Sequence, residues 1–76
     1  MPLSNLRSLP FREVRRRLIA AGWVEVGTTG SHVKFAKRSP AGTRTAIVPK
    51  HREIAVGTLR SILRQAGIGG EEFDRL

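Results

Sequence analysis

The chain has 76 residues, a length that fits one small domain over residues 1–76 and excludes a second. It has no cysteine, which excludes disulfides and thiolate metal sites, and no run of roughly 18 apolar residues that could cross a membrane. Fourteen lysines and arginines against six acidic residues give a formal net charge of +8. This charge favours a polyanionic partner such as nucleic acid; an acidic protein partner and a merely well-solvated surface are the alternatives.

The first predicted element is an amphipathic helix, which follows a loose leader over residues 1–8. Its apolar side chains recur at spacings of three and four: Phe11, Val14, Leu18 and Ala21. Gly22 then ends the helix, because glycine is typical of the position after a helix C-terminus. The opposite face carries Arg12, Arg15 and Arg16. These arginines either contact phosphate or simply face solvent.

Three strands are predicted next, over residues 23–26, 31–37 and 43–48, where β-branched and aromatic residues gather. Thr28 to Gly30 and Arg38 to Gly42 are predicted turns, so the strands form an antiparallel meander. Trp23 is expected to anchor the corner between helix and sheet, in preference to stacking on a base.

The second strand alternates between apolar and polar side chains. Val33 and Phe35 share one face, and His32 and Lys34 share the other. Because the apolar pair should face the helices, the alternation predicts an imidazole and an ammonium side by side on the polar face of the sheet.

The second helix has a regular apolar stripe formed by Leu59, Ile62, Leu63 and Ala66. Gly67 is expected to end it, and Phe73, in a short C-terminal tail over residues 69–76, is expected to pack on the core. The order helix, three strands, helix predicts an α+β domain with a three-stranded antiparallel sheet and both helices on one face. The double-stranded RNA-binding domain has this α-β-β-β-α order.

Four segments follow one another in a distinctive order: Ala-Gly-Trp at 21–23, Gly-Ser-His at 30–32, Val-Pro-Lys-His at 48–51 and Gly-Thr-Leu-Arg-Ser-Ile-Leu-Arg-Gln-Ala-Gly at 57–67. Together they resemble the HicA (YcfA-like) toxin family, from about residue 10 to Phe73. The resemblance implies an mRNA-cleaving toxin of a type II toxin–antitoxin system that arrests translation. It also implies a HicB-like antitoxin partner encoded beside it, and it assigns the family's functional histidine to His32.

RNA carries its own nucleophile, the 2′-hydroxyl, so a ribonuclease without metal has to move protons and stabilise charge on phosphorus. His32 is the candidate general acid or base, a role typically worth about 10²–10⁴-fold in rate. The candidates to hold phosphate are Lys34, Lys37, Arg44 and Lys50. We expect no cofactor, and no metal site, because the two histidines have no carboxylate cluster near them. A catalytic role for His51 stays open.

Two other functions fit the same sequence. A non-catalytic RNA-binding module would keep the basic surface and use His32 only structurally. A protein-interaction domain would bind an acidic partner. Ser31 is assigned to the start of the second strand and not to nucleophilic attack, because no aspartate is spaced to orient a Ser–His pair. The lack of cysteine and of a signal-peptide pattern predicts a cytoplasmic protein.

Overall fold

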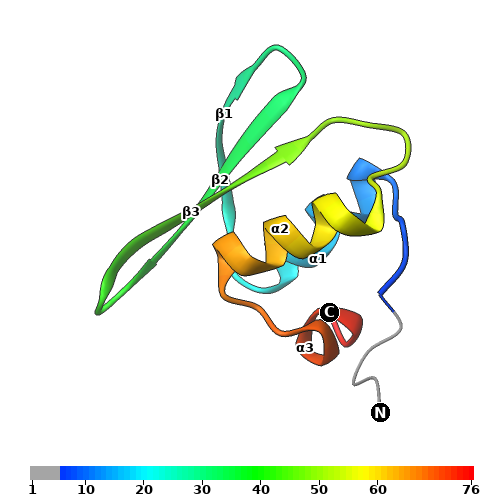
Figure 1. Cartoon of the computed structure of the whole chain (residues 1–76). Helices are drawn as coiled ribbons and strands as arrows, with labels where there is room; N and C mark the ends of the chain where they lie inside the picture. The colour runs from blue at the N-terminus through cyan, green and yellow to red at the C-terminus, as the bar shows by residue number, and fades with distance from the viewer. Residues whose placement is uncertain (1–5) are drawn as a thin grey trace.

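The computed structural model describes residues 6–76, so residues 1–5 of the predicted leader lie outside the described part. Three helices and three strands follow in the order α1 (Phe11–Ala20), β1 (Val24–Thr29), β2 (His32–Ser39), β3 (Gly42–Pro49), α2 (Val56–Ala66) and α3 (Gly70–Asp74). The predicted α-β-β-β-α order of a double-stranded-RNA-binding-like α+β fold is confirmed, with α3 as the extra helical turn of the tail (Figure 1).

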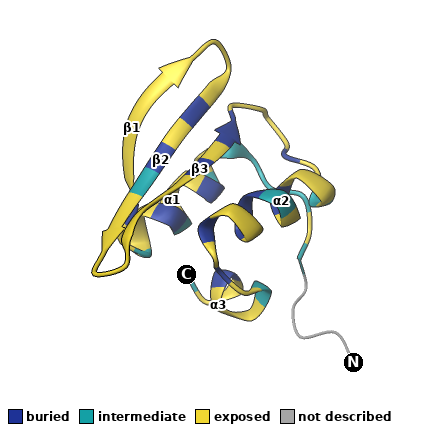
Figure 2. Ribbon diagram, turned by 60° about the vertical axis from the view of Figure 1, so that its left-hand side comes forward, coloured by how far each residue is buried: buried dark blue, intermediate teal, exposed yellow. Residues whose placement is uncertain are grey.

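The three strands form one antiparallel sheet in the order β1-β2-β3. Both long helices lie on the same side of this sheet, as predicted, and the other face is left uncovered (Figure 1). Buried residues of β2 alternate with exposed ones along the strand (Figure 2). The sheet therefore has a helix-covered inner face and an open outer face.

The two hairpin turns are shorter than the sequence suggested. Thr29 pairs with His32, which leaves a two-residue turn at Gly30 and Ser31, and Ser39 pairs with Gly42 in the second hairpin. The prediction that Thr28 and Thr29 lie in the turn was wrong, because these β-branched residues fit a strand and pair across to β2. Gly30 makes the tight turn possible with a φ of +59°, a conformation that glycine adopts without strain.

A β-bulge interrupts β1 at Val26. The pairing moves from Glu25 opposite Phe35 to Gly27 opposite Lys34, so Val26 is the extra residue on β1. The sequence placed the end of the strand at Gly27, but glycine inside a strand also marks a bulge. The strand therefore continues past its glycine to the hairpin turn.

The core lies between the inner face of the sheet and the helices. Its largest fully buried side chains come from every layer: Phe35, Phe73, Leu18, Ile54, Leu59, Ile62, Val14, Val33 and Val48. Trp23 is buried where α1 meets the sheet, and Phe73 packs on the core, as predicted. Among residues 6–76, no helix has the length and apolar character needed to cross a membrane.

The arginines of α1 have a role that the sequence did not indicate. Arg15 Nε donates to Glu25 Oε1 at 2.9 Å, which ties α1 to β1. Arg16 Nη2 and Arg17 Nε both donate to Glu13 Oε2, at 2.7 and 2.8 Å. Two of the arginines expected to contact phosphate or face solvent, Arg15 and Arg16, are therefore held in ion pairs within the chain, as is the neighbouring Arg17.

Two of these arginines also bind the C-terminal segment. Arg17 Nη1 donates to the carbonyl oxygen of Phe73 at 3.2 Å, and its guanidinium carbon lies 4.8 Å from the centre of the Phe73 ring. Arg16 Nη2 donates to the carbonyl oxygen of Leu76 at 3.1 Å. The C-terminal turn is thus fastened to α1 by polar contacts around one buried aromatic ring.

The ion pairs of Glu13 make part of the stability depend on pH. Hydrogen bonds from Arg16 and Arg17 lower the pKa of Glu13 from 4.5 to about 2. Because this pKa is lowered in the folded state, the stabilisation is present above pH 4.5 and is lost as the pH falls toward 2. We expect Glu13→Gln to lower the free energy of unfolding by about 1 kcal/mol at neutral pH, since the carboxylate is partly exposed.

Urea denaturation of both proteins at a series of pH values measures this effect. The difference in unfolding free energy between wild type and Glu13→Gln should shrink steadily below pH 4.5. A difference that stays constant with pH would show that the ion pairs do not cause it.

Candidate active site

His32 is the first residue of β2, directly after the Gly30-Ser31 turn. Its side chain is exposed, whereas the next residue, Val33, is buried against the helices. Because side chains alternate along a strand, His32 belongs to the outer face of the sheet. Its neighbours across the ladder are Thr29 on β1 and Pro49 on β3. The imidazole is therefore accessible to a ligand that lies on the open face.

Lys34 is exposed on the same face, two residues further along β2, or about 7 Å away. Opposite it stands Gly27, where an added Cβ would have no heavy atom within 4 Å. The surface next to Lys34 is consequently open on the β1 side, because Gly27 has no side chain to cover it.

The backbone of Lys50 lies at the same end of the sheet as His32. The N–H of Lys50 donates to the carbonyl oxygen of Ser31 at 2.6 Å, one residue beyond the pair formed by His32 and Pro49. The backbone of Lys50 therefore lies beside the first residues of β2. The structure places His32 and Lys34 on the same face of β2, and it places the main chain of Lys50 at the same end of the sheet.

Negative charge is scarce around this end. Glu25 is the only acidic residue of the three strands, and it forms an ion pair with Arg15 of α1. A phosphodiester on the outer face would meet cationic and neutral groups of the strands. Such a group of residues can transfer a proton through the imidazole and stabilise added negative charge through the lysines. Within residues 6–76, no three side chains of the metal-binding types gather closely enough to hold an ion.

Lys37 and Arg44 lie elsewhere. They pair with each other across β2 and β3, and they share the inner face with the buried Phe35 and Ala46. Lys37 Nζ donates to the carbonyl oxygen of Ala21 at 2.6 Å, at the C-terminal end of α1. These two predicted phosphate contacts are therefore not brought together with His32.

Arg44 stands at the end of the other long helix. Gly67, which ends α2 with a φ of +69°, lies so close to the Arg44 guanidinium that a Cβ there would collide with it. Helix C-termini carry partial negative charge, so a cation near each of them is favourable. The structure gives Lys37 and Arg44 the role of neutralising the ends of α1 and α2.

His51 is exposed in the loop after β3. Its carbonyl oxygen accepts a hydrogen bond from the backbone N–H of Phe11 at 3.1 Å, which joins this loop to the start of α1. The main chain of His51 thus has a structural role.

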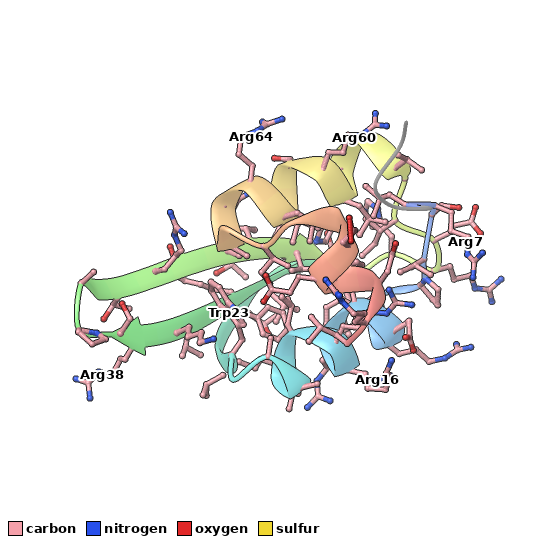
Figure 3. All side chains as sticks on the ribbon, turned by 90° about the horizontal axis from the view of Figure 1, so that it is seen from below. Arg7, Arg16, Trp23, Arg38, Arg60 and Arg64 are labelled. Atoms are coloured by element: carbon pink, nitrogen blue, oxygen red, sulfur yellow. The ribbon has the colours of Figure 1, made fainter. Side chains whose placement is uncertain are left out.

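The predicted site residues do not include the cations on the outer side of α2. Arg60 and Arg64 project away from the sheet (Figure 3), and Arg52 is exposed in the loop before the helix. The four-residue spacing of Arg60 and Arg64 opposite the apolar stripe indicates this exposure, but nothing in the sequence assigns them to the surface that carries His32. Arg38 extends outward at the far end of the β2–β3 hairpin (Figure 3).

Comparison with curated proteins gives no match. The family model described as HicA toxin of bacterial toxin-antitoxin matches residues 11–68, from the start of α1 to just past the end of α2. His32, Lys34 and Lys50 all lie inside the matched range, whereas α3 lies outside it. A toxin of this kind implies an antitoxin partner. Because the match covers well over half of the residues, the chain belongs to the HicA toxin family.

Proposed function

We propose that this toxin is a metal-independent endoribonuclease that cleaves mRNA in the cytoplasm, arrests translation and is neutralised by a HicB-like antitoxin. The observation that carries the proposal is the exposed His32 on the open face of the sheet, next to Lys34 and with Lys50 at the adjacent strand end. The resemblance of Gly-Ser-His at residues 30–32 to the family's functional histidine supports the same role.

The chemistry needs few groups from the protein. The 2′-hydroxyl oxygen of RNA attacks the adjacent phosphorus, a new P–O bond forms, and the bond to the 5′-oxygen of the next nucleotide breaks. His32 either accepts the proton of the 2′-hydroxyl or donates a proton to the departing 5′-oxygen. Lys34 and Lys50 stabilise the negative charge that grows on the phosphate oxygens. Solvent supplies the other proton transfer, so turnover is expected to be slow.

A cleavage assay in EDTA tests this function directly. The purified wild-type toxin is incubated with an mRNA transcript, and both binding and strand cleavage are measured. Cleavage in the chelator supports the metal-independent nuclease. Binding without cleavage selects the alternative, a non-catalytic RNA-binding module. Absence of both selects a protein-interaction domain that binds an acidic partner.

Lys34 and Lys37 offer a matched pair of variants, because both are exposed lysines of β2 but they lie on opposite faces. Lys34→Ala is expected to weaken RNA binding and to reduce the slope of log affinity against log salt by about 1, as for the loss of one phosphate contact. Lys37→Ala should instead lower the free energy of unfolding by about 0.5–1 kcal/mol, since it removes the cation at the end of α1.

Filter binding at several salt concentrations and thermal denaturation distinguish the two effects. If Lys37→Ala weakens RNA binding as much as Lys34→Ala, the assignment of phosphate contacts to the outer face is wrong.

A further inference from the structure

Aliphatic side chains gather on the open face of the sheet. Four large apolar side chains are exposed in the described part of the chain: Ile19 at 43%, Val24 at 60%, Val26 at 54% and Ile47 at 39%. Only Ile19 belongs to a helix; the other three belong to the sheet. Single exposed aliphatic residues are ordinary on protein surfaces, but a cluster of them indicates a binding surface.

The three residues share the outer face. Val24 pairs with Ala36 on β2, and Ile47 pairs with Lys34 from the neighbouring strand. Val24, Val26 and Ala36 line a shallow hollow of about 380 Å³. We call Val24, Val26, Ala36 and Ile47 the apolar sheet patch.

Charge restricts what can cover this patch. Lys34 and Arg38 belong to the same face of β2 and lie on either side of Ala36, whereas Glu25 is paired with Arg15 of α1. A second copy of the chain would place cations against cations. RNA would gain little from the patch, because single strands bind by stacking on aromatic rings and these side chains are aliphatic. The complementary occupant is a protein segment with an apolar centre and carboxylates at its rim.

A protein partner can bind the outer face of the sheet more easily than either of its edge strands. The bulge at Val26 disturbs the regular ladder that an added strand would need on the free edge of β1. On the edge of β3, the backbone N–H of Ile47 already donates to Gln65 Oε1 of α2 at 2.9 Å. A partner is therefore expected to dock on the outer face rather than to extend the sheet.

We propose that the apolar sheet patch is the docking surface for the antitoxin, through an apolar segment flanked by acidic side chains. The inference rests on membership of a toxin–antitoxin family and does not depend on the catalytic role of His32. Ala36, at the middle of the patch, lies four residues along β2 from His32, or about 13 Å. Mutations at the β1 side of the patch are therefore expected to separate antitoxin binding from RNA cleavage.

The test uses Val26→Lys with Ile19→Lys as the matched control, because both replace an exposed aliphatic side chain by the same cation. Each substitution is made in the full chain carrying His32→Ala, and binding to the purified antitoxin encoded next to this gene is measured by calorimetry. Val26→Lys should weaken binding roughly tenfold or more, as for a residue at the centre of an interface. Ile19→Lys should bind like the parent.

A second pair of measurements keeps the result interpretable. Val24→Thr keeps the β-branched shape and should also weaken antitoxin binding, so a fold defect in Val26→Lys does not decide the outcome. Unchanged antitoxin binding by folded Val26→Lys and by Val24→Thr overturns the proposal. RNA binding is measured in parallel, and a loss of RNA binding with normal antitoxin binding also overturns it. Because the binding assay needs no cleavage, failure of the nuclease proposal would not alter its reading.

Discussion

Replacing His32 with alanine is expected to slow RNA cleavage about 10²–10⁴-fold and to leave RNA binding nearly unchanged. The side chain is exposed at the first residue of β2, so its loss should alter the free energy of unfolding by no more than about 0.5 kcal/mol. The loss of rate would then come from the missing proton transfer. Single-turnover cleavage, filter binding and circular dichroism of the same preparation measure the three quantities.

His51→Ala is the matched control, because His51 is the other histidine of the chain and is also exposed. It should cleave at nearly the wild-type rate. A loss as large as that of His32→Ala would assign the second proton transfer to His51 and contradict the mechanism with one histidine. Wild-type cleavage by His32→Ala would remove His32 from the chemistry altogether.

Replacing Phe73 with alanine is expected to have the largest effect on stability, about 3–5 kcal/mol. Phe73 is fully buried, and Arg17 both covers its ring and binds its carbonyl oxygen. A chain of this length has a total stability of only about 4–11 kcal/mol, so the substitution removes a large share of it. Urea denaturation of both proteins gives the difference.

Arg75→Ala provides the control within the same short segment, since the Arg75 side chain is largely exposed. It should change stability by less than about 0.5 kcal/mol. Equal and small effects of the two substitutions would mean that α3 does not contribute to the core. Phe73 lies outside the range that the family model matches. A large effect of Phe73→Ala would therefore show that the stability of this chain also depends on residues beyond the matched range.

The helices and the faces of the second strand were predictable because apolar spacing is a direct signal of which side is buried. Val33 and Phe35 are buried, as their alternation indicated. The hairpin turns were harder to predict, since Thr28 and Thr29 fit a polar turn and an exposed strand equally well. Their place was decided by pairing with β2, and cross-strand register depends on the whole sheet.

The candidate site was predictable only along one strand. His32 and Lys34 are an even number of residues apart, so they had to share a face, whereas Lys37 is an odd number away and faces the helices. Alternation put Arg44 on one face with Ala46 and Val48, but its position opposite Lys37 depends on the register between β2 and β3, which the sequence does not reveal. The ion pair between Arg15 and Glu25 likewise joins residues that only the folded chain brings together.

The pair formed by Lys37 and Arg44 has a consequence for the candidate site. One pair of opposed residues in the β2–β3 hairpin contacts the ends of two different helices, Lys37 by a hydrogen bond to Ala21 and Arg44 by its close approach to Gly67. The hairpin therefore contacts both long helices with its inner face, and His32 lies on the outer face of the same sheet. The imidazole therefore lies on strands that also contact both long helices, an arrangement that favours a preorganised site.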